Sequence, residues 1–266
     1  MERVLFENAN HKFILLGFKE AANEGGVPTN QYLIVNNRKG ILLDPGGFGL
    51  YPKLSERLLN YLDSTEDLVA IFVSHQDPDV AGGVGTWLRL FTEAKVYMSH
   101  VWYRFIPHYN IDDASSFIAI DDRGGTIKVG DAELLVVPAY FNHSPGNLNI
   151  YDPISNILFS GDIGAGADAC PHDDIWVADW FNYSKCITPF HRRYMSSNKT
   201  LRLWVNLVRE LSPSIIAPQH GYLYKGSYVE NLLDFLWDLR CGVDVAEEFY
   251  PKTLKKNAFG QENSML

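Results

Sequence analysis

The chain has 266 residues, of which 46% are hydrophobic, so it is long enough to bury one sizeable core. Its formal net charge of −9 argues against nucleic acid and anionic membranes as partners, because both attract basic proteins. No apolar run approaches membrane-spanning length, and the first residues are interrupted by charge, so we expect a cytoplasmic protein without a signal peptide. We expect residues 1–250 to form one domain and residues 251–266 a polar tail.

The first half of the chain alternates short apolar runs with turn residues. Strands are predicted at 13–16, 31–35, 41–43, 68–73 and 94–98. Residues 53–62 carry apolar side chains at intervals of three and four, which predicts an amphipathic helix, and 84–90 can form a second. The aromatic-rich segment that follows could shape a pocket wall or a dimer contact. It contains His100 and His108, which have no partner at a ligand-like spacing, so we predict that neither binds a metal.

The second half predicts further strands and three helices. The strands are expected at 133–138, within 149–160 as a hairpin, and at 214–218, and the helices at 190–195, 199–211 and 229–239. Residues 164–180 form a long glycine- and aspartate-rich connection, which is a candidate lid. Trp176 and Trp180 could cover a site from this segment. Alternatively, both are core or dimer-interface residues.

The segment 74–83 has the sequence SHQDPDVAGG and follows the buried strand at 68–73. Chemistry in open α/β sheets is commonly located at the carboxyl ends of strands. His75 and Asp77 are two residues apart, so in an extended chain they point to one side and could share a metal, while Asp79 could reach a second. A polar loop with a satisfied histidine is the alternative for this triplet alone. Asp44, which ends an earlier strand, could support a ligand, but its position before Pro-Gly-Gly favours a turn former.

Three more side chains with metal-binding chemistry, His143, Asp162 and His220, follow other predicted strands. Independent core histidines would not be expected to occur repeatedly at strand ends. Three imidazoles and three carboxylates divide into two sites with one bridging carboxylate. The three cysteines are scattered and form no C-x-x-C pair, so no thiolate site is predicted. A nitrogen and oxygen ligand set suits non-haem iron or manganese, and zinc is also compatible.

The order and spacing of these residues resemble the metallo-β-lactamase fold. That fold is an α/β αββα sandwich, in which two mixed β-sheets are flanked by helices. Its hydrolytic branches have the motif H-x-H-x-D-H, whereas this chain has His75-x-Asp77-x-Asp79-Val80. A carboxylate in the second position resembles the flavodiiron branch, whose motif is H-x-E-x-D followed by distant His, Asp and His. Residues 151–162 and 215–221 also look like that branch, and the resemblance covers roughly residues 10–240.

The resemblance implies two iron ions and a ligand set. The first iron would be held by His75, Asp77 and His143, the second by Asp79 and His220, and Asp162 would bridge them. Asp77 is shorter than the glutamate usual at its position. Val80 stands where many relatives have a histidine, which implies an open or water-filled position on the second iron.

The chain resembles most closely the stand-alone oxygen-binding diiron proteins, since no flavodoxin-like domain follows and no Gly-rich phosphate loop is present to hold a flavin. This implies a protein that binds O₂, or NO, as a sensor with chemotaxis-type signalling partners or as a partner-dependent reductase. A homodimer is expected. The alternatives are a metallo-hydrolase of small esters, thioesters or phosphoesters, and a regulatory domain whose metal site only reports its ligand to a partner. Asp77 argues against the hydrolase, because an anion there lowers the Lewis acidity of the metal.

Overall fold

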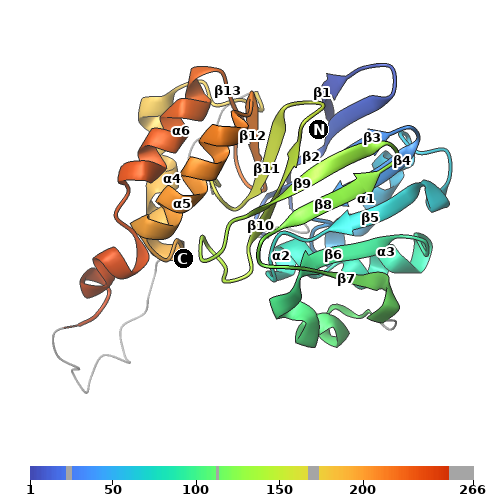
Figure 1. The fold of residues 1–266 in the computed structure, drawn as a ribbon, viewed down its shortest axis with the longest axis horizontal. Helices are drawn as coiled ribbons and strands as arrows, with labels where there is room; N and C mark the ends of the chain where they lie inside the picture. Colours follow the sequence, from blue (N-terminus) through green and yellow to red (C-terminus); the bar gives the residue numbers. More distant parts are fainter. Residues whose placement is uncertain (22–25, 112–113, 167–173, 252–266) are drawn as a thin grey trace.

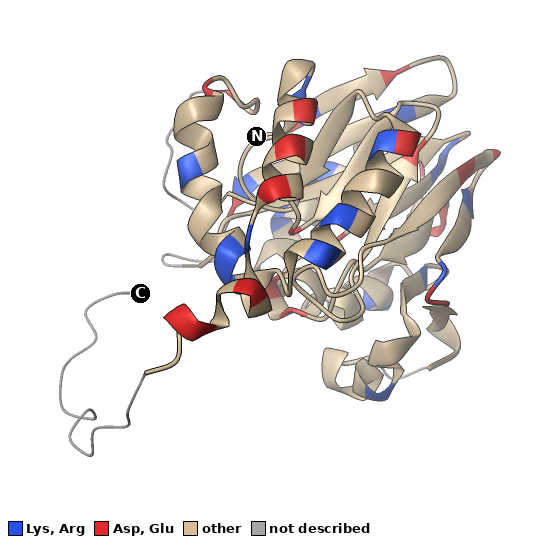
Figure 2. Ribbon diagram, turned by 60° about the vertical axis from the view of Figure 1, so that its left-hand side comes forward, with Lys and Arg blue, Asp and Glu red and all other residues tan. Residues whose placement is uncertain are grey.

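The computed structural model describes residues 1–21, 26–111, 114–166 and 174–251. Two mixed β-sheets pack face to face, and helices cover the outer face of each, which confirms the predicted αββα sandwich (Figure 1). No helix in these ranges is long and apolar enough to cross a membrane. In Figure 2, acidic positions lie along the helix of residues 227–238, and basic positions predominate on the neighbouring helix of residues 198–211.

The first sheet has seven strands in the order of the chain. They are β1 (Arg3–Glu7), β2 (His11–Glu20), β3 (Thr29–Asn36), β4 (Lys39–Leu43), β5 (Leu68–Phe72), β6 (Lys95–Ser99) and β7 (Phe117–Ile120). Pairing is antiparallel from β1 to β4 and parallel from β4 to β7. The parallel strands need crossover connections, and the helices α1 (Tyr51–Leu58) and α3 (Val84–Leu90) lie in them.

The second sheet has six strands in the order β13-β12-β11-β10-β9-β8. Their bounds are β8 (Gly125–Val129), β9 (Ala132–Pro138), β10 (Leu148–Asp152), β11 (Ile157–Gly161), β12 (Ile215–Pro218) and β13 (Tyr224–Lys225). Only β11 and β12 pair in parallel. The connection between them contains α4 (Trp180–Tyr194) and α5 (Asn198–Leu211), and α6 (Ser227–Asp238) follows β13 on the same side of the sheet (Figure 1).

Strand alternation divides the apolar side chains among three clusters. In β2, for example, Ile14 and Leu16 face the cluster under α1 and α3, whereas Phe13 and Leu15 face the cluster between the sheets. A third cluster lies between the second sheet and α4–α6. Because both faces of the central strands are covered, β5 is apolar throughout, and polar groups gather where such a strand ends.

Candidate metal centre

The predicted ligands follow four strands whose ends meet at one edge of the sandwich. His75 and Asp77 lie between β5 and the short helix α2 (Pro78–Ala81), and Asp79 lies in α2, whereas β9, β11 and β12 lead to the other ligands. All six side chains come together, and each lies within 4.0 Å of at least one other; they are His75, Asp77, Asp79, His143, Asp162 and His220.

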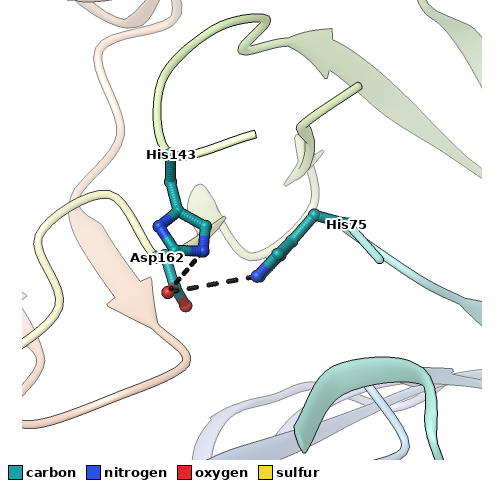
Figure 3. Close-up of side chains that lie close together, drawn as sticks. All are labelled: His75, His143 and Asp162. Atoms are coloured by element: carbon teal, nitrogen blue, oxygen red, sulfur yellow. Dashed lines mark ion pairs between the residues drawn. The ribbon is translucent and has the colours of Figure 1, made fainter. Parts of the chain in front are cut away.

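The first group consists of His75, His143 and Asp77 together with one oxygen of Asp162. Asp77 Oδ2 lies 3.0 Å from His143 Nε2 and 3.7 Å from His75 Nε2. Asp162 Oδ2 lies 3.4 Å from His143 Nε2 and 4.0 Å from His75 Nε2, and both imidazoles point toward this carboxylate (Figure 3). The ligand atoms of His75, His143 and Asp162 lie within 4.8 Å of one another, which is a spacing that could hold one metal ion.

The second group uses the other oxygen of Asp162. His220 Nε2 lies 3.3 Å from Asp162 Oδ1 and 3.3 Å from Asp79 Oδ2. The two oxygens of Asp162 therefore face different histidines, Oδ2 facing His143 and His75 and Oδ1 facing His220. This division is what a carboxylate needs in order to bridge two cations.

The hydrogen bonding of the buried ligand atoms also fits a metal site. His75 is buried, yet its Nε2 has no hydrogen-bond partner in the described part of the chain. Leaving a buried polar atom unpaired costs roughly 1–3 kcal/mol, so such atoms are uncommon unless something else binds them. An unpaired imidazole nitrogen that faces carboxylate oxygens suits a first-row divalent ion.

A buried chain of hydrogen bonds orients His75. Ser74 donates its backbone N–H to Asp44 Oδ1 at 2.7 Å and its hydroxyl to Asp44 Oδ2 at 2.6 Å. The hydroxyl oxygen, 2.9 Å from His75 Nδ1, can then only accept, so Nδ1 carries the imidazole proton. The lone pair of Nε2 consequently faces the site. Asp44 supports a ligand in this way, although its sequence context favoured a simple turn.

Two other hydrogen bonds also turn a ligand atom toward the site. Neither could have been identified from a pattern in the sequence. His220 donates from Nδ1 to the carbonyl oxygen of Pro28 at 2.7 Å, which leaves Nε2 free for the site. The side-chain amide of Gln76 donates to Asp77 Oδ1 at 2.8 Å, so Oδ2 faces the histidines.

Two glycines allow the backbone to turn beside the ligands. Gly161, directly before Asp162, has φ +54°, and the β11–β12 register shifts there as in a β-bulge. Gly221, directly after His220, has φ +78°, and a Cβ there would lie 2.6 Å from the carbonyl oxygen of Gly166. His143 itself has φ +70°. This backbone conformation is uncommon for residues other than glycine and is often found at functional sites.

A family model described as "ODP family beta lactamase" matches residues 27–221. The chain belongs to this ODP family. Two solved structures are 42% identical and cover 94% of this chain and 99% of theirs. One is described as "Peroxy diiron species of chemotaxis sensor ODP", with a TM-score of 0.83, and the other as the apo state of chemotaxis sensor ODP from T. denticola, with a TM-score of 0.85.

More distant likenesses of this ODP-family chain show the fold alone. Rubredoxin oxygen:oxidoreductase from the anaerobe Desulfovibrio gigas is 14% identical with a TM-score of 0.74, over 89% of this chain and 61% of that one. The flavodiiron protein from Giardia intestinalis is 15% identical with a TM-score of 0.74, over 88% of this chain and 58% of that one. No curated protein matches the sequence. The predicted family and fold are therefore confirmed.

The substitution Asp44→Asn should weaken metal binding by this ODP-family chain about 10- to 100-fold, the usual effect of removing the partner that orients a ligand. An asparagine amide would donate to Ser74 Oγ, whose proton would then turn toward His75 Nδ1. That tautomer presents N–H, not a lone pair, to the metal. Metal titration should be performed at pH 8, because burial raises the pKa of Asp44 to about 7. Unchanged affinity in both Asp44→Asn and Ser74→Ala would contradict this role.

Metal binding should release protons and strengthen as the pH rises. Burial lowers the pKa of His75 and of His220, but the nearby carboxylates, Asp162 foremost, together outweigh it and raise both pKa values above the ordinary value. In the metal-free protein these imidazoles therefore stay protonated to higher pH, and a metal ion must displace the protons. Calorimetry in buffers of different ionisation enthalpy should detect net proton release at pH 7. Affinity that is constant from pH 6 to 9 would refute this expectation.

The other histidines and the candidate lid lie elsewhere or cannot be placed. His100 and His108 lie in a 3₁₀ segment, His100–Tyr109, and neither is within 4.0 Å of a site carboxylate; His100 is 3.5 Å from Asp122 instead. His172 and the middle of the candidate lid fall outside the described residues. Trp180 packs against Tyr224 and Phe235, and Trp176 joins the cluster between the sheets. This packing favours the alternative interpretation, in which both tryptophans belong to the core and do not cover the site.

Proposed function

We propose that this chain is a non-haem diiron protein that binds dioxygen as an oxygen sensor. His75, Asp77 and His143 would hold one iron, Asp79 and His220 the other, and Asp162 would bridge them. The observation that carries the proposal is the division of the Asp162 oxygens, with Oδ2 facing His143 and His75 and Oδ1 facing His220.

Iron is favoured over zinc by the ligands and by the relatives. When bound, two ferrous ions can each supply an electron to a diatomic ligand, whereas zinc has no such chemistry. Asp77 places a carboxylate where hydrolytic members of the fold have an imidazole, and its negative charge favours the higher oxidation states of iron. Two ODP structures at 42% identity, one of a peroxy diiron species, are described as a chemotaxis sensor.

The test is to load metal-free protein with ferrous iron under anaerobic conditions and then admit oxygen. We expect close to two iron atoms per chain and an absorbance change that depends on oxygen. A single zinc per chain after growth in iron-replete medium, with no spectral response to oxygen, would refute the proposal. Hydrolysis of thioesters by the loaded protein would favour the hydrolase alternative.

The sensor role implies a signalling partner, and we propose that this partner is a chemotaxis-type protein. We propose O₂ as the ligand, and NO should be tested beside it as a second diatomic ligand. We further propose that residues 1–250 form a single domain, that the protein acts in the cytoplasm, and that two chains form a homodimer. Light scattering after size-exclusion chromatography tests the dimer directly. A partner-dependent reductase would instead consume oxygen continuously when a reduced electron donor is supplied.

A further inference from the structure

The backbone directly after Asp162 is held from both sides by buried side chains. Gly164 donates its N–H to His191 Nε2 at 2.9 Å, and its carbonyl oxygen accepts the hydroxyl of Tyr224 at 2.6 Å. Gly164 has φ +88°, and Ala165 donates to the carbonyl oxygen of Asp162 at 3.2 Å, so the chain turns sharply here. The direction in which the Asp162 carboxylate leaves the backbone depends on this turn.

His191 can act only as an acceptor toward Gly164. It lies on α4 with no exposed surface, and its Nδ1 is 2.7 Å from the carbonyl oxygen of Ile187, one helical turn earlier. A carbonyl can only accept, so Nδ1 carries the proton and Nε2 presents a lone pair. Burial lowers the pKa of His191 to about 4, which keeps the ring neutral at neutral pH. Both ring nitrogens are therefore used, and the tautomer is fixed.

The same helix also contacts a ligand of the first group. Phe190, the residue before His191, stacks on His143 with ring centroids 5.5 Å apart and an interplanar angle of 27°. Helix α4 thus reaches the loop of Asp162 through a hydrogen bond and the loop of His143 through a ring contact. Two loops that are distant in sequence are held by one rigid element.

We propose that His191 is a positioning residue for the diiron site: by accepting the Gly164 N–H, it holds the turn that aims the two oxygens of Asp162 at the two metal positions. The proposal rests on the diiron function proposed above. His191 touches no metal position, and its effect passes through the backbone between Gly164 and Asp162. The second metal position is the more sensitive one, because it has fewer protein ligands and relies on Asp162 Oδ1.

Two substitutions of His191 separate this role from general packing. An asparagine amide reaches the place of Nδ1 but not that of Nε2, so His191→Asn leaves the Gly164 N–H without its acceptor. A glutamine side chain is longer, and its amide oxygen can take the place of Nε2. The matched control is His11→Asn, because His11 is also buried but lies at the opposite end of the sandwich, 2.7 Å from Asp152.

The measurement is a titration of the full-length metal-free proteins with Co²⁺, whose visible absorption reports its coordination, together with thermal unfolding of each metal-free variant. His191→Asn should weaken the second Co²⁺ about 10- to 100-fold, and His191→Gln should restore most of that loss. His11→Asn should lower the unfolding temperature without changing the second affinity. The proposal would be overturned if wild type and His191→Asn bound the second Co²⁺ equally well. It would also be overturned if the asparagine and glutamine variants lost the same affinity in proportion to their loss of thermal stability.

The result for wild type distinguishes the two proposals. If the wild-type chain binds only one Co²⁺ and one iron, the diiron function itself is wrong, and the role of His191 in it is wrong too. If it binds two and His191→Asn binds them equally well, only the positioning role is refuted.

Discussion

Replacing Asp162 with alanine is expected to reduce the iron content from two atoms per chain to at most one. The substitution removes a carboxylate whose two oxygens face His143 and His220 separately, at 3.4 Å and 3.3 Å. Loss of a direct ligand should exceed the 10- to 100-fold effect typical of residues that only support a ligand, so we expect each affinity to fall by more than about 100-fold. Metal analysis and Co²⁺ titration of the purified variant measure this loss.

The matched control is Asp152→Asn, which alters another fully buried aspartate. Asp152 pairs with His11 at the opposite end of the sandwich. This variant should be less stable than wild type but should still bind two iron atoms. Asp162→Asn tests the charge while preserving the shape, and it should lose the second iron first. Two iron atoms bound to Asp162→Ala would show that this residue does not bridge them.

Val80→His should shorten the lifetime of the oxygen-dependent absorbance of the reduced protein by about tenfold or more. A factor of ten corresponds to about 1.4 kcal/mol, which is the effect we expect if the added imidazole binds the second iron in competition with oxygen. Val80 follows Asp79 in α2 and has no exposed surface. The H-x-H-x-D-H motif that this segment resembles has a histidine at this position, whereas Val80 joins the apolar cluster under α1 and α3. The wild-type signal should persist for minutes or longer, and NADH should not be consumed catalytically unless a partner is added. Stopped-flow absorbance and oxygen-electrode measurements test both expectations.

The control for Val80→His is Val80→Leu, because a larger side chain in a packed core costs about 1–3 kcal/mol whatever its chemistry. Val80→Leu should lose stability but keep the long-lived signal. If both variants shorten the signal equally, packing and not ligation controls the lifetime. Rapid oxygen turnover by the wild-type chain alone would contradict the sensor function and favour a reductase.

Local pattern was sufficient to predict the elements nearest to the site. The apolar run before His75 is β5, the run before His143 is β9, and the helix expected at 84–90 has the same bounds as α3. Long apolar runs bounded by turn residues are reliable because burial on both faces of a strand requires them. The repeated placement of imidazoles and carboxylates after such runs indicated the site.

Other elements had weaker local signals. The strands β1 and β7 lie at the two edges of the first sheet, where one side of the strand has no partner and the apolar pattern is short and interrupted. The sequence predicts a helix only at 190–195, whereas α4 begins ten residues earlier and contains Pro189, a residue that removes one backbone hydrogen bond. Packing against α6 and the second sheet outweighs the missing backbone hydrogen bond, and the helix begins at Trp180.

The residue types available for metal binding, their order along the chain and their positions after strands are all visible in the sequence. How these residues face one another depends on the packing of distant segments. The two oxygens of Asp162 are divided between histidines from three other loops, Asp44 orients His75 through Ser74, and His191 reaches the Asp162 turn across 27 residues. Such contacts join segments that are far apart in the chain, and their geometry depends on how two sheets and a helix pack, which no local pattern encodes.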